Sequence, residues 1–271
     1  MVKLHNLTAV RFHGSDAGNF LHNQLSADVL GLEEGASTFA CYCEPKGRVL
    51  ALMLVNRAGE DYYVIMSGEL STSVVARLKI YVMRSKVAID LMGEYAIAGL
   101  RTDDVAGPPL DSAATLQVPG SNLWLVVTDR EIPGWEDEGQ QEAWKLSELQ
   151  LGITWLNGAT SGQFLPQMLG FDQLGAVNYR KGCYPGQEIV ARTRYLGKVK
   201  RHPRLLNCSL TVCPQPMDKV TLHDDEQAYA GHVADCAETG DGSFCIFTVV
   251  RMDPHLKARR IEYLNEITAV F

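Results

Sequence analysis

Residues 181–192 read KGCYPGQEIVAR, and the chemistry of the chain is concentrated in this run. Its centre, Tyr-Pro-Gly-Gln at 184–187, predicts a type II turn, because proline presets φ at the second position and glycine accepts positive φ at the third. We expect a helix to begin at Gln187. The turn would therefore hold Cys183 just before a helix N-terminus.

Cys183 has the neighbours expected of a reactive thiol. Arg180 and Lys181 precede it and a helix dipole follows it, and both features favour thiolate over thiol. A buried structural cysteine is the alternative, and such a cysteine is more often surrounded by apolar residues. We therefore predict a reactive or ligand-donating cysteine at this position.

Positive charge gathers around the motif, although the whole chain of 271 residues has a formal charge of −7. Eight basic residues and one acidic residue, Glu188, fall between Arg180 and Arg204, so this segment carries +7 and the rest of the chain −14. Such a strip suits an anionic ligand or partner, or it is a solvated surface segment. RNA is a further alternative, although residues 192–201 offer a single tyrosine for base stacking.

The first half of the chain predicts mixed α+β structure. Strands are expected at 4–12, 36–43, 48–55, 61–66, 86–91, 95–100, 115–118 and 123–128, with a tight hairpin turn at 44–47. Helices are expected from Ala17, with Asp16 as N-cap, over the stripe from Leu70 to Tyr81, and over 142–151.

The second half predicts an ordered loop followed by a β-rich tail. Residues 152–187 are rich in glycine and lack regular periodicity. Short β-like runs then follow at 204–210, 219–223, 228–234, 243–250 and 260–270, a pattern typical of a small antiparallel barrel or sandwich. We expect three units: an N-terminal α+β unit (1–110), a second α+β unit carrying the motif (111–200) and a C-terminal β-barrel (201–271).

Composition indicates a globular protein without membrane contact. Apolar residues make up 46% of the chain, and the longest apolar run, 49–55, is far shorter than the ~20 residues that span a bilayer. The first residues lack the pattern of a signal peptide, so we expect a cytoplasmic location. Seven irregularly spaced cysteines argue against a disulfide scaffold, and neither Cys41/Cys43 nor Cys208/Cys213 has the spacing of a zinc site.

The motif and its continuation TRYLGKVKR (193–201) resemble the signature of the YgfZ family, folate-binding relatives of the glycine-cleavage T-protein that are also similar to a mitochondrial iron–sulfur assembly factor. Supporting stretches lie at 12–21, 24–29, 45–48, 151–153 and 164–167. The resemblance covers most of residues 4–201.

The resemblance implies a T-protein-like α+β fold, in which the units and a C-terminal antiparallel β-barrel surround a central channel for tetrahydrofolate or a derivative. It also implies a role in the assembly or repair of iron–sulfur proteins, including enzymes that thiomethylate tRNA. Folate and these client proteins would be the partners. The family's functional cysteine falls on Cys183, where an iron–sulfur cluster could be held transiently.

Candidate folate-binding residues follow from the same resemblance. Lys181, Tyr184, Gln187 and Glu188 match the motif, and Lys181, Arg192, Lys198, Lys200 and Arg201 would attract an anionic partner or the glutamate tail of folate. Trp155, Gln163 and Tyr179 are candidate pocket-lining residues, with ordinary packing as the alternative for each.

The chain departs from T-proteins in the strand after the hairpin turn. T-proteins place an aspartate pair there, whereas this chain has Leu50 and Ala51, neither of which can exchange a proton. We therefore do not expect classical aminomethyl transfer. Two alternatives stay open: a one-carbon transferase that uses Asp16, Asp28 or Glu188 as its acid, and a tRNA-contacting module acting through residues 180–204.

Overall fold

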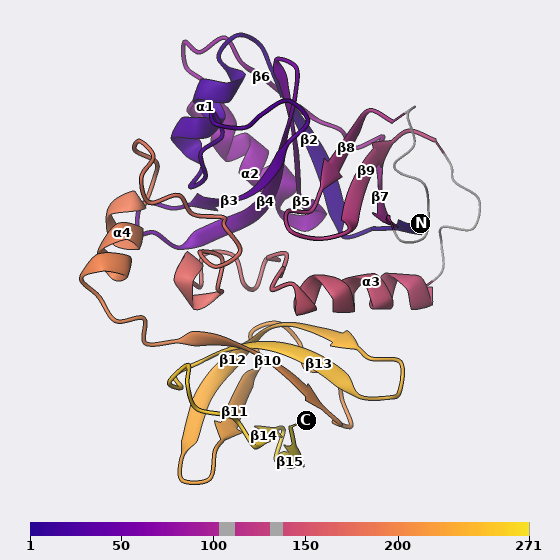
Figure 1. Ribbon diagram of the computed structural model, residues 1–271, viewed down its shortest axis with the longest axis vertical. Helices are drawn as coiled ribbons and strands as arrows, with labels where there is room; N and C mark the ends of the chain where they lie inside the picture. Colours follow the sequence, from indigo (N-terminus) through magenta and orange to yellow (C-terminus); the bar gives the residue numbers. More distant parts are fainter. Residues whose placement is uncertain (103–111, 131–137, 271) are drawn as a thin grey trace.

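A computed structural model describes residues 1–102, 112–130 and 138–270 of the chain. Two antiparallel sheets form its N-terminal part, and a six-stranded sheet forms its C-terminal part (Figure 1). Helix α3 (Glu138–Gln150) contacts both parts, since it packs on β1 as well as on β12 and β13. The fold is mixed α+β.

The five-stranded sheet has the order β3-β4-β5-β2-β6, and every neighbouring pair is antiparallel. Its strands are β2 (Leu7–His13), β3 (Ser37–Cys43), β4 (Val49–Ala58), β5 (Asp61–Ser67) and β6 (Ala88–Leu91). Helix α1 (Ala17–Gln24) contacts β5, and α2 (Gly68–Ile80) contacts β2, β4, β5 and β6. β4 is almost entirely buried, which explains its continuous apolar run.

The four-stranded sheet has the order β1-β7-β9-β8, and it joins the first residues of the chain to much later ones. Its strands are β1 (Val2–Lys3), β7 (Ala96–Arg101), β8 (Ala114–Gln117) and β9 (Leu123–Thr128). Most of its buried apolar residues belong to the same core as the five-stranded sheet.

The C-terminal sheet curls into a half-barrel with the order β10-β13-β12-β11-β14-β15. Its strands are β10 (His202–Cys208), β11 (Lys219–His223), β12 (Ala228–Glu238), β13 (Phe244–Val250), β14 (Arg260–Tyr263) and β15 (Glu266–Ala269). A single bridge between Cys208 and Val270 joins the two outer strands at one end. The half-barrel has an apolar core of its own.

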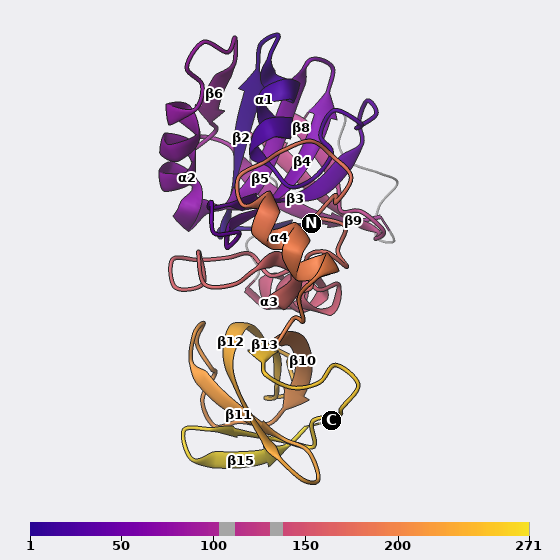
Figure 2. The same cartoon turned by 90° about the vertical axis from the view of Figure 1, so that its left-hand side faces the viewer.

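Residues 151–187 form an ordered loop with one short 3-10 helix, η1 (Pro166–Met168), and lead to α4 (Gln187–Tyr195). Both views place α4 at the level between the N-terminal sheets and the half-barrel (Figures 1 and 2). The motif is therefore positioned where several segments of the chain meet.

Most predicted elements are confirmed, two expectations are corrected, and one strand was missed. The run 260–270 forms two strands, because Leu264 and Asn265 take positive φ (49° and 67°) and reverse the chain without a glycine. The two-residue strand β1 was not predicted. Asp16 stands at the N-cap of α1, but its carboxylate accepts the Lys86 N–H at 2.6 Å and caps no N–H of the helix.

The proposed boundary at 110/111 lies outside the described residues, and the division into three units stays a prediction. Within the described ranges, no helix combines the length and apolar content needed to cross a bilayer.

Candidate functional site

The predicted type II turn before α4 is confirmed. Gly186 has φ 83° and ψ −1°, the values of the third residue of such a turn. The Gln187 N–H donates to the Tyr184 carbonyl oxygen at 3.2 Å, which closes the turn, and α4 begins at Gln187. Cys183 thus lies in irregular chain immediately before the turn.

The β3–β4 hairpin turn packs directly against the motif. A Cβ added to Gly186 would lie 2.4 Å from the Glu44 carbonyl oxygen and 2.7 Å from the Gly47 Cα. Gly47 has φ 76°, and a Cβ there would lie 3.1 Å from the Cβ of Ile189 in α4. Both glycines are required for this close approach of two backbones.

Lys181 anchors the motif to the C-terminus of α1. Its ammonium donates to the carbonyl oxygens of His22 and Leu25, the second at 2.6 Å. These carbonyls lie at the negative end of the α1 dipole, where a cation is stabilised. The same ammonium stands 5.1 Å from the centre of the Tyr184 ring, within cation–π range.

Burial lowers the pKa of Lys181 to about 8, although the electrostatic interactions of Lys181 with Asp28 and with Cys183 act to raise it. Burial also raises the pKa of Tyr184, so its phenol stays protonated at neutral pH. Lys181 is 9% exposed and Tyr184 is 7% exposed, whereas Cys183 between them is exposed. The loop therefore buries its flanking side chains and presents its thiol.

A histidine and a carboxylate lie behind the motif. His22 Nδ1 is 3.3 Å from Asp28 Oδ1, and its Nε2 would lie 3.9 Å from a Cβ added to Gly182. Burial and the charge of Lys181 lower the pKa of His22, although Asp28 opposes this, so the imidazole is neutral at pH 7. Sequence reasoning assigned His22 no function. His22 lies between the supporting stretches 12–21 and 24–29, six residues before Asp28, and this position was the available signal.

One face of β3 lies beside three of the predicted residues: Trp155, Tyr179 and Tyr184. Strand periodicity places Phe39, Cys41 and Cys43 on that face. The Trp155 ring packs 6.2 Å from Phe39, and the phenols of Tyr179 and Tyr184 are close enough to the β3 thiols for these to raise their pKa values. The fold thus brings Trp155, Tyr179 and Tyr184 to a common surface.

Trp155 is engaged within the core. Its indole N–H donates to Glu148 Oε1 at 2.9 Å, and the side chain is buried. Burial raises the pKa of Glu148 to about 7, although this hydrogen bond acts to lower it.

Tyr179 lies at the centre of a polar cluster beside α4. Its hydroxyl oxygen accepts from Gln167 Nε2 at 3.1 Å, and the same nitrogen donates to the Val190 carbonyl at 2.8 Å. Arg194 stands over the ring at 5.4 Å. Burial, with the negative charge of Asp172, raises the pKa of Tyr179 to about 12. Gln167 Oε1 and Asp172 Oδ1 are buried acceptors without a hydrogen-bond partner among the described residues.

The remaining predicted residues are more peripheral. Gln187 donates through Nε2 to the Lys181 carbonyl at 3.3 Å, and Glu188 and Arg192 are exposed on α4. Gln163 is exposed, and its carbonyl accepts from Arg48 at 3.3 Å. The fold does not gather all the candidate folate residues at one point.

Leu50 and Ala51 lie in β4, where residues 161–164 cover the start of the strand. Ser161 Oγ donates to the Leu50 carbonyl at 2.7 Å, and Ala51 is buried. The alternative acids have other partners: Asp16 accepts from Lys86 N–H, and Asp28 accepts from Gly31 N–H at 3.1 Å and faces His22. No contact among the described residues favours a proton-transfer role for them.

Four surface pockets formed by described residues lie elsewhere. The largest of these, about 500 Å³, is lined by Arg101, Trp144 and residues near the N-terminus. A second, of about 380 Å³, lies between Leu149–Gly152 and the half-barrel residues Pro203, Leu205 and Phe247. Neither pocket, nor the other two, includes Cys183 in its lining.

Comparison with known proteins identifies the scaffold. The chain is 27% identical over 267 residues to the tRNA-modifying protein YgfZ of Klebsiella pneumoniae, covering 89% of this chain and 81% of that protein. It is 26% identical to the tRNA-modifying protein YgfZ of Colwellia psychrerythraea, covering 96% and 88%. It is also 29% identical over 202 residues to an uncharacterized protein of Haemophilus influenzae, covering 74% and 70%. No protein-family model matches the chain.

The chain thus resembles the YgfZ family over most of its length. Among solved structures, the glycine cleavage system aminomethyltransferase T of Bartonella henselae matches 99% of this chain and 83% of its own, with a TM-score of 0.70 and 12% identity. At that identity the likeness shows the fold alone. The chain therefore has a T-protein-like fold, with a half-barrel at its C-terminus.

Proposed function

We propose that the chain binds a reduced folate and supports the assembly or repair of iron–sulfur proteins, including enzymes that thiomethylate tRNA, through the thiol of Cys183. The proposal is supported by its relatives, which are named tRNA-modifying proteins, and by the T-protein-like fold. The observation that carries it is the presentation of Cys183: an exposed thiol on a loop whose neighbouring side chains are buried.

The surroundings of Cys183 suit a ligand-donating sulfur. Thiolate rather than thiol binds iron or attacks a sulfur atom, and a nearby cation stabilises it. Lys181 supplies such a charge from a position that its two carbonyl partners hold in place. Cys183 would release its proton to solvent and donate a sulfur lone pair to iron. With a sulfur-bearing partner, it would instead attack one sulfur of the partner's disulfide and displace the other as a thiolate.

Folate fits the polar cluster around Tyr179. A pterin ring carries an amino group and a ring N–H, which are donors, and the unpartnered Gln167 Oε1 and Asp172 Oδ1 are buried acceptors beside Tyr179. The exposed Arg192, Lys198 and Lys200 follow on α4 and just beyond it, and would attract the glutamate carboxylates. Bound tetrahydrofolate would supply a carrier of one-carbon units, but Leu50 and Ala51 offer no acid or base to transfer one.

Calorimetric titration with tetrahydrofolate under anaerobic, reducing conditions tests the folate half. We expect saturable one-site binding. Asp172→Asn should weaken it, and the matched control Asp225→Asn, an exposed carboxylate in the half-barrel, should leave it unchanged. Absence of binding at millimolar folate would remove folate from the proposal.

Complementation of a bacterial strain lacking its own YgfZ tests the thiol half. Cys183→Ala should fail to restore the activity of iron–sulfur enzymes, whereas Cys245→Ala, which alters a buried cysteine of the half-barrel, should restore it. Full restoration by Cys183→Ala, at equal protein level, would contradict a role for the thiolate.

Contact with tRNA is a second candidate, because Tyr195 is 66% exposed at the end of α4 among basic residues. An exposed ring beside Arg192 and Arg194 offers both base stacking and phosphate contacts. Binding of tRNA should weaken steeply with salt, and Tyr195→Ala should reduce it. No binding at low salt would exclude this candidate.

A further inference from the structure

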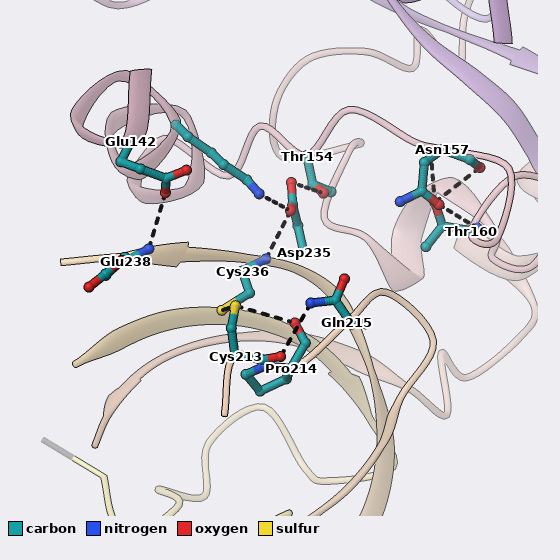
Figure 3. A network of polar contacts seen from close by, with 11 residues as sticks. Glu142, Thr154, Asn157, Thr160, Cys213, Pro214, Gln215, Asp235, Cys236 and Glu238 are labelled. Carbon is teal, nitrogen blue, oxygen red and sulfur yellow. Dashed lines mark hydrogen bonds and ion pairs between the residues drawn. The ribbon is translucent and has the colours of Figure 1, made fainter. Parts of the chain in front are cut away.

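Two cysteines of the half-barrel lie with their sulfur atoms in contact. Cys213 Sγ and Cys236 Sγ are 3.4 Å apart, and both thiols are free (Figure 3). Cys213 comes from the loop between β10 and β11, and Cys236 from β12. Cys236 is buried, whereas Cys213 is partly exposed and therefore accessible to small molecules.

Strand pairing places these residues together. β11 pairs with β12 from Lys219 opposite His232, and the pairing continues backward through Met217 N–H, which donates to the Val233 carbonyl at 2.8 Å. The register shifts between Val233 and Asp235, a β-bulge in the β12–β13 pairing. Beyond it, Cys236 packs in the core of the half-barrel, where Cys213 also packs.

The other described cysteines lack this combination of contact and access. Cys208 lies opposite Phe244, and Cys245 lies opposite Asn207, so the two thiols point to opposite faces of the sheet. Cys41 and Cys43 are both 1% exposed or less. Among the described thiols, Cys213 and Cys236 thus stand out as a pair that a soluble oxidant can reach.

We propose that Cys213 and Cys236 form a reversible dithiol–disulfide pair that exchanges with low-molecular-weight disulfides such as glutathione disulfide. The Cys213 thiolate attacks one sulfur of the small disulfide, forms a mixed disulfide and releases one small thiolate. Cys236, after losing its proton, attacks the Cys213 sulfur and releases the second. The protein loses two protons and two electrons, and the small disulfide is reduced to two thiols.

The order of attack follows from burial. Burial, together with the neighbouring Cys213, raises the pKa of Cys236, so the partly exposed Cys213 reacts first. Closure by Cys236 should therefore accelerate as pH rises, because the thiolate is the attacking form.

The cysteine pair lies next to the contact between the half-barrel and α3, because Asp235, the neighbour of Cys236 in β12, forms part of that contact. The carboxylate of Asp235 accepts from the Cys236 N–H at 2.8 Å and from Lys145 of α3 at 2.9 Å, and it lies 3.4 Å from Thr154 Oγ1 (Figure 3). A bond at Cys236 would restrain the strand that carries this carboxylate. Oxidation is thus expected to stiffen the side of the half-barrel that faces the rest of the protein.

The test is peptide mapping of the full chain after incubation with glutathione disulfide and alkylation of remaining thiols. Trypsin releases Cys208 and Cys213 together in residues 205–219, and Cys236 and Cys245 together in 220–251. We expect these two peptides to be linked in the oxidised protein. The link should vanish in Cys213→Ser and in Cys236→Ala, and should persist in the matched control Cys208→Ala.

A second measurement covers the case in which Cys236→Ala folds poorly. The oxidised chain should melt about 5 °C or more above the reduced chain, because the bond closes the β11–β12 segment in the unfolded state. Cys213→Ser, at a partly exposed position, should abolish this difference. The proposal is overturned if only a glutathione adduct forms, if the linked peptides persist in Cys213→Ser, or if Cys208→Ala removes them.

Discussion

Gly186 and Gly47 lie in backbone contact, although 138 positions separate them in the chain. A Cβ on Gly186 would come within 2.7 Å of the Gly47 Cα and within 2.4 Å of the Glu44 carbonyl oxygen. The contact joins the β3–β4 hairpin turn to the turn that precedes α4. It therefore sets the position of Cys183 relative to the five-stranded sheet.

Gly186→Ala should destabilise the protein by ~2–4 kcal/mol, since it adds a backbone clash to the strain of a positive φ. Gly175→Ala is the matched control: Gly175 has φ 81°, but a Cβ there meets nothing within 4 Å, so only strain of ~1 kcal/mol is expected. Urea unfolding of both variants measures the difference. Equal losses would show that the contact with the hairpin turn contributes nothing.

Lys181→Met should slow the reaction of Cys183 with iodoacetamide by about five-fold at pH 7, the effect of ~1 kcal/mol of charge–charge interaction. The physical reason is loss of the ammonium that favours the thiolate. In the wild-type chain this advantage should fade as pH rises through 8, because Lys181 has a pKa of about 8 and then loses its charge. The rate is followed by mass mapping of the tryptic peptide 182–192 (181–192 in the variant), which carries Cys183 alone, because Cys213 is also accessible to small molecules.

Lys200→Met is the control for that experiment, because Lys200 is an exposed member of the same basic strip. Its alkylation rate should match the wild type. An unchanged rate in Lys181→Met would mean that the buried ammonium serves only to attach the motif to α1.

Glu148→Gln should stabilise the protein at pH 8 by ~3 kcal/mol and change it little at pH 5. The folded-state pKa of about 7 lies above the ordinary value of 4.5, so the folded state binds more protons between these two pH values and stability falls as pH rises through them. Glutamine stays neutral and still accepts from the Trp155 indole N–H. The control is Glu142→Gln, at an exposed position of α3, whose effect on stability should not depend on pH in this way. If Glu148 were charged in the folded state at pH 5, the effect of Glu148→Gln on stability would likewise not change between pH 5 and pH 8.

Asp235 and Lys145 should be energetically coupled by ~1 kcal/mol, because their ion pair of 2.9 Å is only partly exposed. A double-mutant cycle of Asp235→Asn and Lys145→Met measures this coupling from denaturant unfolding. Additive effects would indicate that this ion pair adds nothing to the contact between α3 and the half-barrel.

The local structure of the motif was predictable from its residues. Pro185 fixes φ at the second position and Gly186 accepts positive φ at the third, so the type II turn and the start of α4 follow from them. The same holds for β9 and β11, whose limits match the sequence pattern. The reversal at Leu264 and Asn265 was missed, because residues other than glycine rarely take positive φ and the pattern shows no turn signal.

The partners of Lys181 were not predictable in the same way. The motif suggested a ligand contact, but the structure places the ammonium on the carbonyls of His22 and Leu25. Nothing near Lys181 in the sequence indicates that these carbonyls are within reach. Its assignment to folate stays a prediction, and its contacts within the fold are the observed fact.

The sequence by itself determined the turn, the helix after it, the exposed reactive cysteine as a hypothesis and the family resemblance, since each depends on residues a few positions apart. Only the tertiary structure decided that α1, the β3–β4 hairpin and the loop at 181–186 meet, and that Cys213 contacts Cys236. The physical reason is that backbone preferences act over a few residues, whereas contacts across scores of residues depend on strand register and on the packing of a shared core.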